Sequence, residues 1–146
     1  MHFGAEFNYF DAMASAQKSY GRLLEPICQE WKLTRTELNV MLFLYNNPEF
    51  DRAADIVAHR GLTKSHVSLS VSNLEGRGLL TRREDPEDRR AVHLILSGEG
   101  RTIAEAGREY QVSFFGAMFE GLSREELLQL QDLMDRIREN IKRMEG

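Results

Sequence analysis

The fold of this chain is decided by residues 51–101, DRAADIVAHRGLTKSHVSLSVSNLEGRGLLTRREDPEDRRAVHLILSGEGR. The pattern predicts a short helix that ends at Gly61, a tight turn, and a second helix over residues 64–77 that Thr63 caps through its side-chain oxygen. Gly78 can adopt the left-handed backbone that ends this helix, and a strand, a charged loop and another strand follow. This order predicts a winged helix-turn-helix, a fold that usually places its second helix in the DNA major groove.

The second helix of this unit has two contrasting faces. At 100° per residue, Val67, Val71 and Leu74 form one apolar stripe that should face the core. The opposite face is small, hydroxylated and nearly uncharged, so serine hydroxyls could reach base edges or phosphates and a leucine could rest against a thymine methyl. A solvated face of poor helix formers is the alternative. The residues of this helix that we expect at DNA are Lys64, Ser65, His66, Ser68, Leu69 and Ser72.

The two strands should form a charged hairpin, the wing. Val92, Leu94 and Leu96 alternate as in a half-buried strand, and Asp85-Pro86 starts a turn in a loop too charged to be core. A solvated loop of mixed charge is the alternative, but the arginines lie where a wing would meet the DNA backbone or minor groove. A carboxylate two positions before an arginine could hold its guanidinium by a bidentate pair. The wing residues we expect at DNA are Arg82, Arg83, Asp88, Arg89 and Arg90.

Residues 88–97, DRRAVHLILS, resemble the wing signature of the MarR family of bacterial transcriptional regulators, Asp-x-Arg followed after five residues by Leu-Thr. Residues 62–80 resemble that family's recognition helix, and the resemblance extends over essentially the whole chain. It implies that Arg90 enters the minor groove, that Asp88 orients it, and that a dimer binds the DNA. The chain departs from the family at Leu69, where relatives often carry a basic residue.

Composition is typical of one modest globular chain. Of its 146 residues 42% are hydrophobic and 29% charged, and a single cysteine excludes an internal disulfide framework. The net charge is −4, yet residues 52–101 carry nine Lys and Arg against seven Asp and Glu. We therefore expect DNA binding through a limited basic footprint and with strong salt dependence. We expect no signal peptide, and no apolar run is long enough to span a bilayer, so the sequence predicts a cytoplasmic protein without a membrane partner.

The flanks of the winged helix-turn-helix, residues 33–97, predict how it is mounted in this single MarR-type chain. We expect the segments 1–32 and 98–146 to supply dimerisation helices, with Pro26 kinking or interrupting the first of them. The last helix carries a heptad stripe over about two and a half repeats, although packing on its own core is the alternative. A twofold dimer would read a roughly palindromic operator. The expected dimerisation residues are Phe7, Phe10, Leu127, Leu130, Met134, Ile137 and Ile141.

A ligand-responsive repressor is the expected function, with a small-molecule effector between the dimer helices and the winged unit. For each residue of the expected cleft, packing in the core is the alternative. For the whole chain, the alternative functions are a winged-helix module that binds proteins rather than DNA, and a regulator that senses oxidants through Cys28. Glutamates near Cys28 should raise its pKa and oppose that last role. The cleft residues are Tyr20, Trp31, Met41, Phe43 and Tyr45.

Enzymatic and metal functions have little support in the sequence. Asp55 and His59 form an i, i+4 pair with His66 nearby, so a transition-metal site is conceivable, but ordinary polarity of a helix surface explains them more simply. The chain has no nucleophile turn, no glycine-rich phosphate loop and no pair of framed carboxylates. We expect no catalytic activity, no cofactor and no metal.

Overall fold

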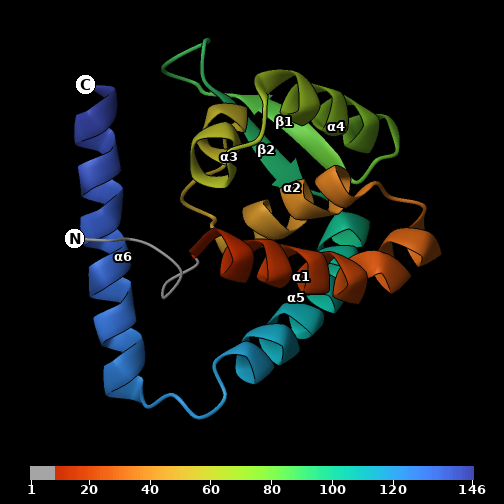
Figure 1. Cartoon of the computed structure of the whole chain (residues 1–146). Coiled ribbons are helices and arrows are strands. Elements are labelled where there is room, and N and C mark those ends of the chain that lie inside the picture. The colour runs from red at the N-terminus through yellow and green to blue at the C-terminus, as the bar shows by residue number, and fades with distance from the viewer. Residues whose placement is uncertain (1–8) are drawn as a thin grey trace. The chain divides into compact units, whose positions relative to one another are not determined.

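The computed structural model describes residues 9–146, and within them the chain forms six helices and one two-stranded antiparallel sheet (Figure 1). The predicted class, mainly helical with a small hairpin wing, is confirmed. The chain divides after Phe114, inside a helix, into two compact units. In order, the elements are α1 Tyr9–Trp31, α2 Arg35–Asn46, α3 Ala53–Arg60, α4 Lys64–Gly76, β1 Leu80–Glu84, β2 Val92–Leu96, α5 Gly98–Met118 and α6 Arg124–Glu145.

The helix-turn-helix forms where the sequence predicts it. Gly61 ends α3 with a left-handed backbone at φ 63°, and Gly78 does the same after α4 at φ 71°. The Thr63 hydroxyl accepts the backbone N–H of His66 at 3.1 Å, which satisfies one of the donors that a helix start leaves unpaired. Val67 and Leu74 are fully buried, so the predicted apolar stripe of α4 does face the core.

The wing is an antiparallel pair whose register runs from Leu80 opposite Leu96 to Glu84 opposite Val92. The buried side chains of the hairpin hold it against the helices, and the loop between the strands projects at the top of the view (Figure 1). The sheet therefore presents its charged loop away from the core.

The centre of the first unit is α2. A capping box starts this helix, since Thr34 accepts the backbone N–H of Glu37 at 3.1 Å while the Glu37 carboxylate accepts that of Thr34 at 2.8 Å. Leu38 and Met41 are fully buried, and each such side chain stabilises the fold by about 1.5–3 kcal/mol relative to exposure. This core fixes the platform on which α3, α4 and the wing are carried.

Of the two effects expected of Pro26, a kink or an interruption, the interruption is wrong, because α1 continues past this residue to Trp31; the kink stays a prediction. A proline removes a single backbone donor, and hydrogen bonds on either side can hold the helix together. The end of α1 is instead completed by Arg77, which follows α4. Its guanidinium donates to the carbonyl oxygens of Trp31 at 2.5 Å and of Lys32 at 2.8 Å. These two bonds join the end of α1 to the end of the second helix of the motif.

The second unit consists of the end of α5 and the whole of α6. Ser123 and Glu126 form a capping box at the start of α6, with backbone-to-side-chain distances of 2.8 and 3.1 Å. No α6 residue is buried within the single chain, and Ile141 of the heptad stripe is 50% exposed. None of the described helices has the length and apolar character that crossing a membrane requires.

Candidate nucleic-acid interface

The outer face of α4 is open to solvent along its length. Leu69 lies at the centre of this face and is 62% exposed. The face carries no carboxylate until Glu75, near its end. A surface of small side chains lets another molecule approach the helix closely, and its hydroxyl groups supply hydrogen bonds. The α4 residues that the sequence places at DNA are all exposed: Lys64, Ser65, His66, Ser68, Leu69 and Ser72.

Arg82 connects this face to the wing. Its Nη2 donates to the Ser72 hydroxyl at 3.0 Å, and its Nε lies 3.5 Å from a carboxylate oxygen of Glu75. The sequence predicts that Arg82 and Ser72 each contact DNA, but it does not predict a bond between them. Their hydrogen bond means that Arg82 also sets the direction of the Ser72 hydroxyl, which sequence spacing alone does not reveal.

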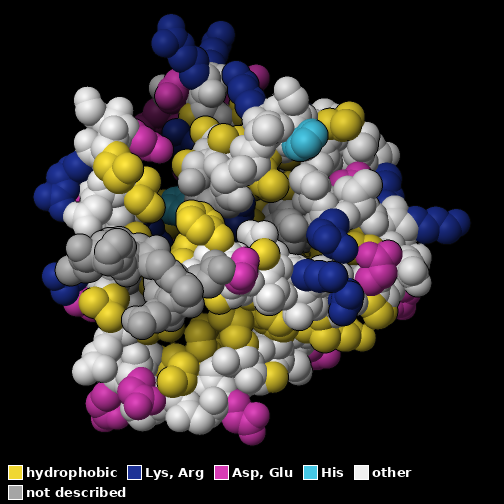
Figure 2. All heavy atoms as spheres, in the orientation of Figure 1, with side chains coloured by type: hydrophobic (Ala, Val, Ile, Leu, Met, Phe, Trp, Pro, Cys, Tyr) yellow, Lys and Arg dark blue, Asp and Glu magenta, His cyan; other side chains and the backbone are white. Residues whose placement is uncertain are grey.

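The remaining wing arginines extend into solvent. Figure 2 shows Lys and Arg side chains projecting at the top of the view, where the loop of the hairpin lies. Arg83, Arg89 and Arg90 are exposed, and within residues 9–146 none of them has a carboxylate within 4.0 Å. Guanidinium groups without an ion-pair partner can bind phosphates or a narrow minor groove without first breaking an internal ion pair.

Asp88 acts on the backbone of the loop rather than on a guanidinium. Its Oδ1 accepts the backbone N–H of Arg90 at 3.0 Å, and the predicted bidentate pair with the Arg90 side chain does not form in this structure. A short carboxylate readily closes a turn onto the N–H two residues ahead, and this local bond competes successfully with an exposed ion pair. Asp88 therefore shapes the segment from which Arg90 projects.

A second set of contacts at the wing was not predicted from the sequence. The Nδ1 of His93, in β2, lies 2.8 and 2.9 Å from the two carboxylate oxygens of Asp51, and its Nε2 lies 2.8 Å from Oδ2 of Asp85. These hydrogen bonds, that to Asp85 first and that to Asp51 second, raise the pKa of His93, and the bond from His93 holds the pKa of Asp85 below its usual value. The histidine thus joins the base of the wing to its loop.

The expected cleft residues divide between the core and a polar junction. Met41 and Phe43 are buried in the core, whereas Tyr20, Trp31 and Tyr45 are partly buried. Burial raises the pKa of Tyr20. These placements put the five side chains around the interior of the first unit, where packing explains Met41 and Phe43.

The polar junction is organised by Gln111 of α5, a residue that no sequence pattern indicated. Its Nε2 donates to the Tyr20 hydroxyl at 2.7 Å, and its Oε1 accepts from Asn46 at 2.8 Å. Three helices, α1, α2 and α5, are joined through this one amide. Gln111 is separated from Tyr20 by 91 residues, so no local pattern in the sequence could have paired them.

The structure places the cysteine and the candidate metal pair as structural residues. Cys28 is buried, and burial followed by the charge of Glu25 raises the pKa of its thiol, which disfavours the reactive thiolate. Asp55 accepts the backbone N–H of Arg52 at the start of α3, at 3.1 Å. The His59 ring packs against the Phe50 ring, tilted by 38°, with ring centroids 4.6 Å apart. Among the described residues no three His, Cys, Asp or Glu side chains gather as metal ligands would.

The expected dimerisation residues lie on exposed or undescribed parts of the chain. Phe7 lies outside the described residues, and Phe10 is 80% exposed. On α6 the stripe of Leu127, Leu130, Met134, Ile137 and Ile141 is at least partly exposed throughout.

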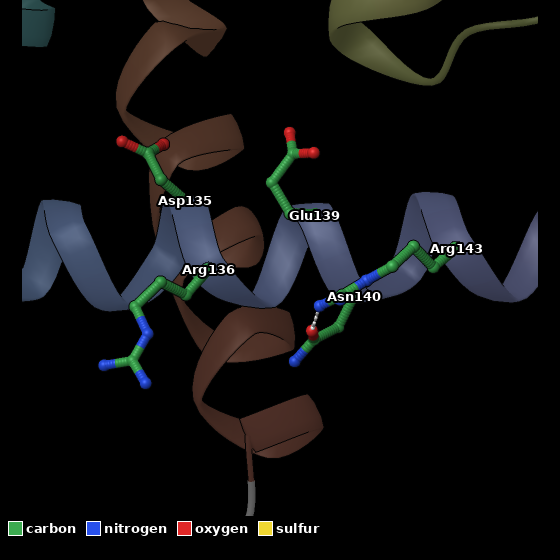
Figure 3. Close-up of a pocket in the computed structure, with 5 residues that line it drawn as sticks. All are labelled: Asp135, Arg136, Glu139, Asn140 and Arg143. Atoms are coloured by element: carbon green, nitrogen blue, oxygen red, sulfur yellow. Dashed lines mark hydrogen bonds between the residues drawn. The ribbon is translucent and has the colours of Figure 1, made fainter.

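The other side of α6 is polar. Figure 3 shows a shallow hollow on this helix, lined by Asp135, Arg136, Glu139, Asn140 and Arg143, with Arg143 donating to Asn140. One helix supplies all five side chains, so the hollow is part of the solvated face of α6. The helix thus combines a polar side with an unburied apolar stripe.

An exposed helix of small polar residues beside an arginine-bearing hairpin defines a winged helix-turn-helix DNA-binding protein. Residues 31–91, from the end of α1 to the end of the wing loop, match the family model described as MarR family. This segment of the chain is therefore similar to the MarR family, and the curated relatives of the chain are HTH-type transcriptional regulators.

Individual relatives agree with this similarity. YdgJ of Bacillus subtilis (strain 168), an uncharacterized HTH-type transcriptional regulator, is 27% identical over 114 residues, covering 78% of this chain and 69% of the relative. A structure assigned to the MarR family, from Listeria monocytogenes and complexed with a 26mer DNA, aligns with a TM-score of 0.79 at 14% identity, covering 92% of this chain and 89% of that chain. BpsR of Bordetella bronchiseptica, whose DNA binding is regulated by 6-hydroxynicotinic acid, aligns with a TM-score of 0.66 at 22% identity, covering 94% and 96%. At these identities the structural likeness establishes the shared fold.

Proposed function

We propose that this protein is a homodimeric repressor that binds a roughly palindromic operator and releases it when a small molecule binds. The observation that carries the proposal is the pairing of an uncharged, hydroxyl-rich outer face on α4 with exposed arginines at the wing. The α4 face would read base edges in the major groove while Arg90 enters the adjoining minor groove. Such a regulator acts in the cytoplasm and catalyses no reaction.

Dimerisation is supported by the apolar stripe of α6. Ile137 and Ile141 remain about half exposed in the single chain, and burying them against a second copy would remove this surface from water. A twofold axis would then present two α4 helices to half-sites about one turn of DNA apart. The second copy therefore matters for affinity as well as for solubility.

An effector site is supported by the junction of α1, α2 and α5. Tyr20, Asn46 and Gln111 supply polar groups that are partly buried and could be exchanged for those of a ligand. The fold relative BpsR responds to 6-hydroxynicotinic acid, an aromatic carboxylic acid. We propose ligands of the same general class, small aromatic acids, for this chain.

Selection of bound DNA from a random pool, followed by fluorescence anisotropy on the selected sequence, tests the proposal. We expect one inverted-repeat sequence to be enriched and bound by the dimer at physiological salt, and a subset of aromatic acids to weaken that binding. Enrichment of no sequence would contradict the proposal and favour a winged-helix module that binds proteins.

A further inference from the structure

We propose that His93, Asp51 and Asp85 form a clamp that positions the wing, so that its loop is ordered before it reaches DNA. The inference deepens the proposed function, on which it rests, and assigns His93 as a positioning residue for minor-groove binding. His93 itself is 18% exposed in its side chain and lies below the loop, so it acts through the loop rather than by touching DNA.

The clamp is anchored at its lower end by the backbone as well as by a side chain. Asp51, which precedes α3, receives the His93 ring on its carboxylate, and its carbonyl oxygen accepts the backbone N–H of Leu94 at 2.8 Å. Asp51 is therefore bonded to two consecutive residues of β2. The helix-turn-helix and the wing are held together at this point.

At its upper end the clamp organises the loop. Asp85 uses Oδ2 for His93, while its Oδ1 accepts the backbone N–H groups of Glu87 at 2.9 Å and Asp88 at 3.2 Å. Asp88 in turn accepts the backbone N–H of Arg90. An unbroken series of hydrogen bonds thus runs from the core side of the wing to the residue that we expect in the minor groove.

The geometry requires a charged histidine. Both ring nitrogens face carboxylate oxygens at 2.8–2.9 Å, and only the imidazolium form donates from both. The ionisable groups facing the ring are Asp51 before α3, Asp85 in the loop and Arg83, its cross-strand partner in β1. Two carboxylates against one guanidinium favour the cation, in agreement with the raised pKa of His93.

The clamp explains why carboxylates are tolerated in a loop that faces DNA. Phosphate repels Asp85, so this residue carries a Coulombic cost on binding. An ordered loop offsets that cost, because side chains that are already positioned lose less conformational freedom when they bind. The two effects have opposite signs, and a substitution can separate them.

Asp85→Asn is the decisive variant, and Glu87→Gln is its matched control. Each removes one negative charge from the same loop, but only Asp85 contacts His93 through its side chain. On the selected operator at fixed salt we expect Asp85→Asn to bind about five- to tenfold more weakly, and Glu87→Gln to bind equally or more tightly. Tighter binding by both variants would overturn the clamp, as would equal weakening by both.

A pH series supplies a second, independent readout. In a His66→Gln background, which removes the exposed histidine of α4, affinity should fall as pH rises through the raised pKa of His93, since the clamp is intact below that pKa. Adding His93→Gln should make the profile flat. The imidazole ¹⁵N shifts of His93 should report both nitrogens protonated at pH 7. A neutral ring at pH 7 would overturn the inference.

The outcomes distinguish this inference from the proposed function. If no operator is selected, the proposed function fails, and the ¹⁵N shifts together with hydrogen exchange of the loop amides still test the clamp. If an operator is selected and Asp85→Asn binds it as wild type does, only the clamp fails. Circular dichroism of each variant excludes unfolding as the cause of lost binding.

Discussion

At the scale of single residues, the wing depends on short carboxylates that bond to the backbone. Asp88 shows this most directly, because its contact with the Arg90 backbone replaces the guanidinium pair that the sequence suggests. This hydrogen bond fixes the backbone position of Arg90 but leaves its side chain free to move. The affinity contributed by Arg90 should therefore depend on the hydrogen-bonding capacity of residue 88 more than on its charge.

Asp88→Ala and Asp88→Asn test this distinction. Both remove the negative charge, so Coulomb repulsion alone predicts tighter operator binding by both. Because an asparagine oxygen still accepts the Arg90 N–H, we expect Asp88→Ala to bind about three- to tenfold more weakly than Asp88→Asn. Anisotropy titrations at one salt concentration measure the difference, and equal affinities would refute the role of the backbone bond.

We propose that Arg82 links a phosphate contact to base reading, because its guanidinium donates to the Ser72 hydroxyl. Arg82→Ala should change base preference at the positions nearest Ser72, because the hydroxyl of that serine is then free to rotate. Arg83→Ala, which breaks no such bond, should weaken all sequences alike and reduce the salt slope by about 1. The comparison is made by measuring the affinity of both variants for a panel of operator variants. If Arg82→Ala lowered the affinity for every operator equally, Arg82 would not influence base reading by Ser72.

At the scale of elements, local signals predicted the fold well because they act over a few residues. The caps at Thr34, Thr63 and Ser123 and the turn at Gly61 each satisfy a requirement of the adjoining helix end. Contacts between elements that are distant in the sequence were harder to predict. His93 and Asp51 are 42 residues apart, and only the approach of β2 to the start of α3 brings them together.

Two glycines near the end of α4 should respond oppositely to the same change. Gly78 has φ 71°, so an alanine there is strained and should lower the free energy of unfolding by about 1 kcal/mol. Gly76 is helical with open space around its Cα, and Gly76→Ala should raise that free energy by about 0.5–1 kcal/mol. Urea titrations of both variants provide the measurement. A stabilised Gly78→Ala variant would contradict the observed backbone.

At the scale of the whole molecule, the buried core and the proposed surface for assembly belong to different compact units. The core is complete around α2, while α6 buries none of its side chains in the single chain. The sequence predicted the heptad stripe of α6 because its periodicity is local, yet the partner that covers the stripe cannot be read from one chain. The expected cleft residues illustrate the same limit, since Met41 and Phe43 look alike in sequence whether they line a ligand or a core.

Ile137→Asp and Ile141→Asp should each dissociate the proposed dimer, because each would bury a carboxylate where no partner is evident. Asn140→Asp, on the polar side of α6, adds the same charge and should leave the dimer intact. Sedimentation velocity at micromolar concentration distinguishes monomer from dimer. A monomeric wild type, or a monomeric Asn140→Asp variant, would refute the assignment of this stripe.

The uncovered stripe of α6 also has a consequence for dosage. If two copies must meet to cover it, the amount of active regulator rises as the square of the chain's abundance while dimers are scarce. Halving synthesis would then reduce operator occupancy by more than half. A steep threshold in gene expression would follow from a row of isoleucines and leucines on α6, with no change in any residue proposed to touch a base.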